Sequence, residues 1–158
     1  MDCNCKKSAN IRVKYAPNQN KRLVHDGDWV DLYSNETVFI PQGMNAMVNL
    51  GVCIELPAHT EAIVAPRSST FKHWGVVLCN NIGVIDEGYN GDNDWWMLNL
   101  FCLKGMTRNE LGIVGSYIKK GDKIAQFRIQ KKMPKLEFEE VETLNNEDRG
   151  GFGTKGTE

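Results

Sequence analysis

Residues 37–57 read TVFIPQGMNAMVNLGVCIELP, and this stretch decides the fold class. Residues 37–40 combine β-branched and aromatic side chains, which favour strands, and residues 41–43 (PQG) have the composition of a turn. A second apolar run extends from Met47 to Leu56, and Pro57 closes it. Runs of this kind, separated by turn residues, predict strands.

The same alternation of β-rich runs and turn residues continues along the chain. Ile11–Tyr15 alternates apolar and basic side chains with the period of two expected of a half-buried strand. Further strands are expected at His59–Ala65, Val76–Asn80, Trp95–Leu103, Ile113–Ile118, Lys123–Gln130 and Leu136–Val141. The spacing of the turns favours a sandwich, a jelly roll or a closed barrel over βαβ units, so the predicted fold class is all-β.

Helix is expected in one short segment after Arg67, where Ser68 and Ser69 are candidates for its cap. The sequence has no internal repeat or low-complexity linker, which predicts a single domain over residues 1–144. Residues 145–158 differ, because glycine is frequent there and Phe152 is the one large apolar residue. We therefore expect a flexible C-terminal tail.

The 158 residues are 41% hydrophobic and 25% charged, with a formal net charge of -1, which is the composition of an ordinary globular protein. That charge argues against binding to a nucleic-acid backbone but allows a small phosphorylated ligand.

The cysteines are scattered, and Cys3 and Cys5 lack a second Cys/His cluster for a zinc site. The sequence shows neither a signal peptide nor an apolar run near the ~20 residues that span a bilayer. We expect a soluble, cytoplasmic protein without membrane contact.

Two segments combine turn residues with chemically useful groups. In residues 80–91 (NNIGVIDEGYNG), glycines suit a tight hairpin that a ligand can approach, and Asp86 is expected at a strand end, where a carboxylate can deprotonate a water. In residues 66–70 (PRSST), Arg67 stands beside hydroxyl side chains at the start of a helix, an arrangement suited to an anion. Taken singly, these segments also fit a plain hairpin and an ordinary helix cap with a surface arginine.

Two further segments are weaker when taken alone. Residues 121–126 (GDKIAQ) combine a turn with core residues, and Gln126 is equally explained as a solvated side chain. Residues 149–156 (RGGFGTKG) bring glycines, two cations, a hydroxyl and an aromatic ring that can fold over a phosphate and stack on a base. A disordered tail explains the same residues equally well.

Together and in this order, these segments resemble the trimeric dUTPase family over residues 11–156. Its five motifs are similar to residues 31–32, 67–69, 80–91, 121–126 and 149–156. The resemblance implies a jelly-roll-like, distorted β-barrel and a homotrimer with active sites at the subunit interfaces. It also implies hydrolysis of dUTP to dUMP and pyrophosphate, which limits uracil in DNA and supplies dUMP for dTMP synthesis.

The resemblance also implies roles for individual residues. Asp86 resembles the general base that activates the attacking water, and Tyr89 resembles the residue that packs against the deoxyribose. Asn80 and the backbone at Gly83 and Ile85 are expected to read the uracil edge. The implied contacts to the phosphates and to the outer face of the base are Arg67, Ser68, Ser69, Gln126, Arg149, Phe152, Gly153 and Thr154.

Mg²⁺ is the cofactor that the resemblance implies. It is expected on the triphosphate oxygens and waters, without a direct protein ligand, and Asp31 and Arg67 resemble residues that support this arrangement. The expected partners are therefore dUTP and further copies of the same chain.

Two alternatives stay open. A dCTP deaminase shares the fold and a similar Arg-Ser-Ser segment, but it needs a glutamate on the strand after the third motif, and residues 92–103 contain none. The other alternative is a binding protein whose nucleotide site acts as a switch for a regulatory protein partner. Exposed aromatic side chains at Trp95 and Trp96 and the long segment Met106–Tyr117 would form its surface, although packing in a core or interface explains them more simply.

Overall fold

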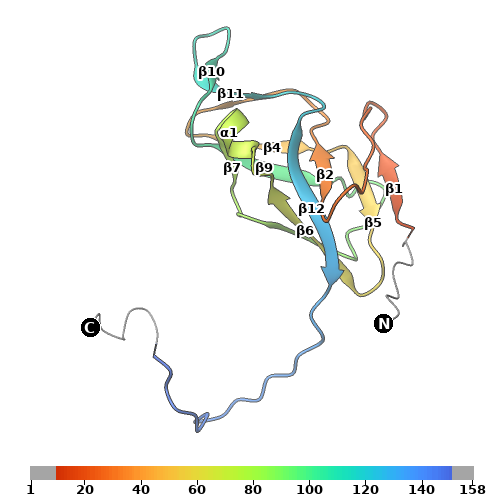
Figure 1. Cartoon of the computed structure of the whole chain (residues 1–158), viewed down its shortest axis with the longest axis vertical. Coiled ribbons are helices and arrows are strands. Elements are labelled where there is room, and N and C mark those ends of the chain that lie inside the picture. Colours follow the sequence, from red (N-terminus) through yellow and green to blue (C-terminus); the bar gives the residue numbers. More distant parts are fainter. Residues whose placement is uncertain (1–9, 151–158) are drawn as a thin grey trace.

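Residues 10–150 are described by the computed structural model of this chain (Figure 1). Within them, antiparallel strands form four small sheets, and one short helix, α1 (Thr70–Trp74), lies beside them. The first sheet pairs β1 (Arg12–Tyr15) with β5 (Val52–Glu55), and the second has the strand order β10 (Thr107–Arg108), β11 (Val114–Ile118), β3 (Val38–Pro41). The third, with four strands, has the order β2 (Val30–Tyr33), β12 (Lys123–Lys131), β6 (Thr60–Pro66), β8 (Gly83–Asp86). The fourth has the order β4 (Asn45–Asn49), β9 (Met97–Cys102), β7 (Val76–Leu78). The all-β prediction is confirmed, and the barrel-like body is open, because no ring of paired strands closes within the described residues.

One apolar core fills the space between the sheets. Along β9, Leu98, Leu100 and Cys102 are at most 3% exposed, whereas Met97 is 37% exposed, as the period of two requires. The largest buried side chain, Trp96, meets Phe127 of β12 edge to face, with ring centroids 5.1 Å apart. Trp96, directly before β9, thus packs against β12 in the core. β12 is the strand that carries part of the candidate site.

Most predicted strands are present within a few residues of their predicted bounds. The apolar run from Met47 to Leu56 forms β4 and β5, separated by a turn at Gly51, where φ is +66°. The sequence pattern does not predict β2 and β10 as strands, and the two residues of β10 are too few to show a period.

The strand predicted at Leu136–Val141 is wrong for the single chain. β12 ends at Lys131, and residues 132–150 run away from the body, with Phe138 91% exposed (Figure 1). Apolar and acidic side chains alternate from Leu136 to Glu139, but a strand needs a neighbour that takes its backbone hydrogen bonds. No strand in residues 10–150 lies beside this segment. Residues 132–150 are therefore exposed and belong to no strand.

The two surfaces suggested for a regulatory partner differ in exposure. Trp96 is 1% exposed and lies in the core, and Trp95 is half-buried, so packing, the simpler of the two explanations, accounts for this pair. The segment Met106–Tyr117 contains β10, a turn and most of β11, and it projects from the body, with Leu111 83% exposed (Figure 1).

The helix α1 is short and ends abruptly. Ser69 occupies its N-cap position, but the side chain makes no capping hydrogen bond, so the predicted cap by a serine hydroxyl is wrong. Gly75 ends the helix with a φ of +62°, and a Cβ there would overlap the carbonyl oxygen of Lys104. Within residues 10–150, no helix has the length and apolar character needed to span a membrane.

Candidate active site

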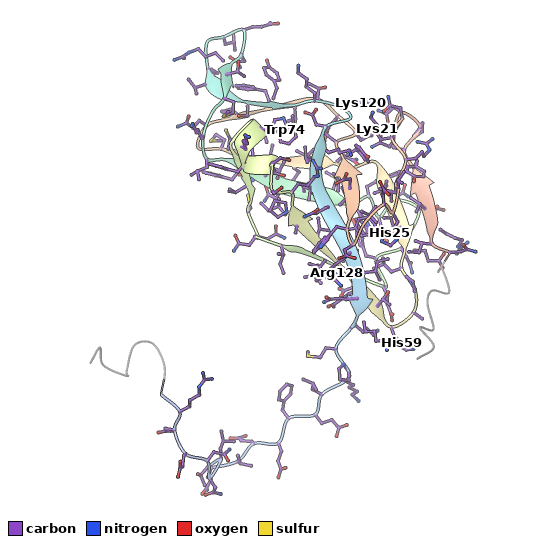
Figure 2. The ribbon with its side chains drawn as sticks, in the orientation of Figure 1. Lys21, His25, His59, Trp74, Lys120 and Arg128 are labelled. Atoms are coloured by element: carbon purple, nitrogen blue, oxygen red, sulfur yellow. The ribbon has the colours of Figure 1, made fainter. Side chains whose placement is uncertain are left out.

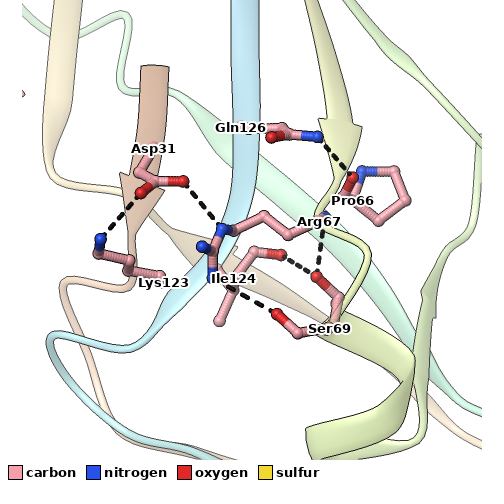
Figure 3. Close-up of polar contacts among 8 residues, drawn as sticks. Asp31, Pro66, Arg67, Ser69, Lys123, Ile124 and Gln126 are labelled. Atoms are coloured by element: carbon pink, nitrogen blue, oxygen red, sulfur yellow. Dashed lines mark hydrogen bonds and ion pairs between the residues drawn. The ribbon is translucent and has the colours of Figure 1, made fainter. Parts of the chain in front are cut away.

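Three charged residues from separate parts of the chain meet at one end of the four-stranded sheet (Figure 3). Arg67, between β6 and α1, places Nε 2.8 Å from Oδ1 of Asp31 on β2. Lys123, at the start of β12, places Nζ 2.9 Å from Oδ2 of the same carboxylate. The hydrogen bond to Asp31 is the main cause that raises the pKa of Lys123, so this amine stays charged at neutral pH. Two cations around one carboxylate leave a positive charge for an anion.

Thr70 is a buried connector that the sequence motifs do not reveal. Its hydroxyl accepts a hydrogen bond from the backbone N–H of Arg67 at 2.9 Å and donates one to the carbonyl oxygen of Ile124 at 3.0 Å. It therefore holds the start of α1 against the start of β12. Only the pairing of β6 with β12 brings these segments together, so no local signal points to Thr70. Lys123 is also missed, although its place inside the fourth motif was an available signal.

The other predicted phosphate contacts surround Arg67. Gln126 on β12 donates from Nε2 to the carbonyl oxygen of Pro66 at 3.2 Å. The hydroxyl of Ser69 accepts a hydrogen bond from Nη1 of Arg67 at 3.4 Å, while Ser68 is exposed. The structure thus brings the second and fourth motifs together with the aspartate of the first motif.

Asp86 lies at the end of β8, the edge strand of the same sheet. β8 pairs with β6 alone, so its other edge has no partner strand in residues 10–150. Asp86 is exposed, whereas Ile85 packs against the core and offers a ligand only its backbone. The predicted tight hairpin is wrong, because β7 pairs with β9 while β8 pairs with β6. Residues 80–91 instead form a turn, an edge strand and a second turn.

The turn before β8 places Asn80 on the surface. Asn81, rather than a glycine, adopts the positive φ, at +57°. Gly83 is required for packing instead, since an added Cβ would lie 3.2 Å from Cβ of Val64 on β6. The backbone of β8 therefore sits close against its neighbour on one side and is accessible on the other.

Tyr89 is fixed beside Asp86 by two hydrogen bonds. Its backbone N–H donates to the carbonyl oxygen of Asp86 at 3.0 Å, and its hydroxyl donates to the carbonyl oxygen of Trp95 at 3.1 Å. The residue is 40% exposed. An aromatic wall therefore stands next to the carboxylate at the end of β8.

The turn after β8 is anchored through Glu87. Its carboxylate accepts hydrogen bonds from the backbone N–H of His59 and from Nζ of Lys132, the latter at 2.6 Å. The bond from Lys132 is the main cause that lowers the pKa of Glu87. His59 lies at the end of the body from which residues 132–150 depart (Figure 2). The neighbour of Asp86 is thereby tied to the start of this exposed stretch.

Asp31, Arg67 and Lys123, which we call the Arg67 cluster, lie far from Asp86 within one chain. Gln130 lies opposite Glu61, and Glu61 lies opposite Asp86, so Asp86 is two strands away from β12 and four residues along it from Gln126. At about 3.3 Å per residue and about 4.8 Å between strands, Asp86 and Gln126 are on the order of 15 Å apart. A single chain cannot direct both groups at one phosphorus atom.

The remaining predicted contacts belong to the C-terminal segment. Arg149 lies in the exposed stretch after β12. Phe152, Gly153 and Thr154 lie outside the described residues. Within residues 10–150, no group of three or more His, Cys, Asp or Glu side chains lies close enough to hold a metal ion.

Comparisons with known proteins agree on one family. Residues 30–157 match the model of the dUTPase family. The SPbeta prophage-derived deoxyuridine 5'-triphosphate nucleotidohydrolase of Bacillus subtilis (strain 168) is 46% identical over 149 residues, which cover 93% of this chain and 98% of that protein. A deoxyuridine 5'-triphosphate nucleotidohydrolase of Clostridioides difficile is 39% identical over 137 residues, covering 85% of this chain and 87% of that protein.

Solved dUTPase structures have the same fold. A variant of the Staphylococcus bacteriophage 80alpha dUTPase with dUpNHpp has a TM-score of 0.74 at 19% identity, covering 95% of this chain and 100% of that one. A variant dUTPase from phage phi11 of S. aureus, in which a structural Mg(II) ion is coordinated, has a TM-score of 0.69 at 19% identity, covering 87% and 100%.

The role of Thr70 is tested by Thr70→Val, which keeps the shape of the side chain and removes its hydroxyl. The free energy of unfolding should fall by about 1–3 kcal/mol, because the N–H of Arg67 and the carbonyl of Ile124 lose their partner. Urea unfolding measures this change. Thr70→Ser keeps the hydroxyl and should lose less; equal losses in the two variants would show that the hydroxyl does not matter.

Proposed function

The chain belongs to the dUTPase family, and from this premise we propose that it hydrolyses dUTP to dUMP and pyrophosphate. The observation that carries the proposal is the end of β8, where Asp86 is exposed beside a free strand edge and Tyr89 is bonded to it. Hydrolysis of a deoxyuridine nucleotide needs a general base for the attacking water, backbone groups that hydrogen-bond to the uracil, and a side chain that packs against the deoxyribose. The deaminase alternative is not favoured, because the relatives are nucleotidohydrolases.

Asp86 is proposed to act as the general base. Its carboxylate accepts a proton from the water that attacks the α-phosphorus, and the bond to the pyrophosphate leaving group breaks. Because phosphoryl transfer requires little covalent help from a protein, positioning and charge neutralisation carry most of the catalysis.

The uracil and the sugar are proposed to bind along β8. A strand edge without a partner strand presents N–H and C=O groups that can pair with the polar edge of a base. Gly83 and Ile85 contribute backbone groups, and Asn80 stands at the start of the same segment. Tyr89 packs against the deoxyribose and leaves no room for a 2′-hydroxyl.

The phosphates are proposed to bind at the Arg67 cluster. Arg67 and Lys123 supply positive charge, and the side chains of Ser68, Ser69 and Gln126 supply hydrogen bonds. Asp31 orients the two cations rather than binding the phosphates itself.

Mg²⁺ is proposed to enter as part of the substrate, on the triphosphate oxygens. Asp31 fits this arrangement as an indirect support, because both of its carboxylate oxygens already bind cations. When bound, the ion supplies further neutralisation of the triphosphate charge.

A homotrimer with shared sites is proposed for two reasons. The first is the separation between Asp86 and the Arg67 cluster, which another copy can bridge. The second is a pocket of about 410 Å³ beside β1, lined by apolar side chains that include Val13, Tyr15 and Phe127. Within residues 10–150, β1 pairs with β5 alone, so one edge is open. The exposed apolar side chains of Leu136–Val141 suit both that edge and the pocket.

Residues 145–158 are proposed to close over the bound nucleotide. In this arrangement Phe152 stacks on the uracil, and Arg149, Gly153 and Thr154 contact the γ-phosphate. Fixing each backbone residue costs about 1–2 kcal/mol, so closure requires the base and the triphosphate together.

The reaction is tested first by nucleotide selectivity. Pyrophosphate release should be fast with dUTP and slow with dCTP, dTTP and UTP. Asp86→Asn should still bind dUTP but lose about 10²–10⁴-fold in turnover, because the general base is removed.

Glu61→Gln is the matched control, because Glu61 is the carboxylate directly opposite Asp86. It should keep most of the turnover. Ammonia released from dCTP would replace the proposed reaction with a deamination. Unchanged turnover in Asp86→Asn would remove this residue from the mechanism.

Two truncations separate assembly from closure. Ending the chain after Glu147 should leave the trimer intact and largely abolish turnover, because Phe152 and Thr154 are lost. Ending it after Lys132 should also dissociate the trimer, because the segment Leu136–Val141 is lost. Sedimentation measures the assembly and pyrophosphate release measures the turnover. Normal activity after the first truncation would contradict the closure, and a stable trimer after the second would contradict the role of this segment.

A further inference from the structure

The loop Asn90–Trp95, which follows Tyr89, is held in place by a side chain from β1. Nζ of Lys14 donates a hydrogen bond to the carbonyl oxygen of Asp92 at 2.7 Å and lies 3.2 Å from Oδ1 of the same residue. It also lies 5.6 Å from the centroid of the Trp95 ring. One ammonium group therefore contacts the loop at two residues.

The contact with the Asp92 backbone matters more than the ion pair. The Asp92 side chain is 87% exposed, and an ion pair at such a surface contributes little. The carbonyl oxygen of Asp92 also accepts from Sγ of Cys53 at 3.7 Å, and Cys53 is the register partner of Lys14 on β5. The sheet formed by β1 and β5 thus holds the loop by its backbone.

The loop is closed by its own hydrogen bonds. The carboxylate of Asp94 accepts the backbone N–H of Gly91 at 2.7 Å, and the N–H of Asp94 donates to the carbonyl oxygen of Gly91 at 3.1 Å. The chain then enters the core, where the N–H of Trp96 donates to the carbonyl oxygen of Val52 at 2.9 Å. The loop therefore connects the residue that Lys14 binds to Trp95 through a hydrogen-bonded turn.

Trp95 in turn fixes the ring of Tyr89, whose hydroxyl donates to its carbonyl oxygen at 3.1 Å. We propose that Lys14 is a positioning residue that determines the discrimination between deoxyribose and ribose, by holding the loop that fixes Tyr89. The proposal rests on the proposed function. The ring of Tyr89 excludes a 2′-hydroxyl only if the ring is held in position. Displacements on the order of 1 Å change rates by up to about 10²-fold.

The experiment compares Lys14→Met with Arg12→Met in the full chain. Arg12 is a cation on the same strand that pairs with Glu55 of β5, away from the loop, so it is the matched control. The measurement is the ratio of kcat/KM for dUTP to kcat/KM for UTP, read as pyrophosphate release. Lys14→Met should lower this ratio about tenfold, because a displacement of the ring admits the ribose. Arg12→Met should leave it unchanged, and Lys14→Arg should restore most of it.

Tyr89→Phe provides a second route that leaves β1 intact. It removes the hydroxyl that bonds to Trp95, so the ratio should fall as in Lys14→Met, and the double variant should lose little more than either single one. An unchanged ratio in Lys14→Met, in a protein that unfolds at the same temperature as Arg12→Met, would overturn the proposal. If Lys14→Met does not fold, an unchanged ratio in Tyr89→Phe overturns it instead. Absence of dUTP turnover in the unaltered chain would overturn the proposed function itself, and is distinct from these outcomes.

Discussion

β12 lies between β2 and β6. The registers of these two pairings determine the positions of Gln126 and of the Arg67 cluster. Gln126 lies opposite Asp31 on one side and opposite Ala65 on the other. The chain leaves β6 beside the start of β12, so Arg67 and Lys123 reach the same carboxylate from opposite directions. A slip of one residue would turn Gln126 toward the core and separate the two cations. The positive site is thus a consequence of strand register.

Local patterns in the sequence are sufficient for the fold class and for most strands, because alternation and turn residues act over a few positions. They are insufficient where a role depends on distant contacts. Thr70 bonds to Ile124, and Lys14 bonds to Asp92, 78 residues away, so neither has a local signature. Leu136–Val141 shows the converse case, since its first four residues alternate as in a strand but no partner strand lies beside them in the described part of the chain.

The features that a single chain leaves unsatisfied are complementary to one another. In the part of the chain that the structure describes, β1 has an open edge with an apolar pocket beside it, and Phe138 of the segment after β12 is 91% exposed. Exposing such a side chain to water costs about 1.5–3 kcal/mol relative to burial. In the proposed trimer each copy binds the segment Leu136–Val141 of one neighbour and contributes its own segment to the other neighbour. Three such contacts form a closed ring.

Glu87 connects the start of the exposed segment to the end of β8. It follows Asp86 directly, and its carboxylate binds Lys132, the first residue after β12. Because Lys132 lowers the pKa of Glu87, the pair is intact at neutral pH and is lost only as the pH falls through that lowered value. The exposed segment therefore leaves the body from a point fixed beside Asp86. In the proposed trimer, the segment that another copy receives therefore starts next to the proposed general base.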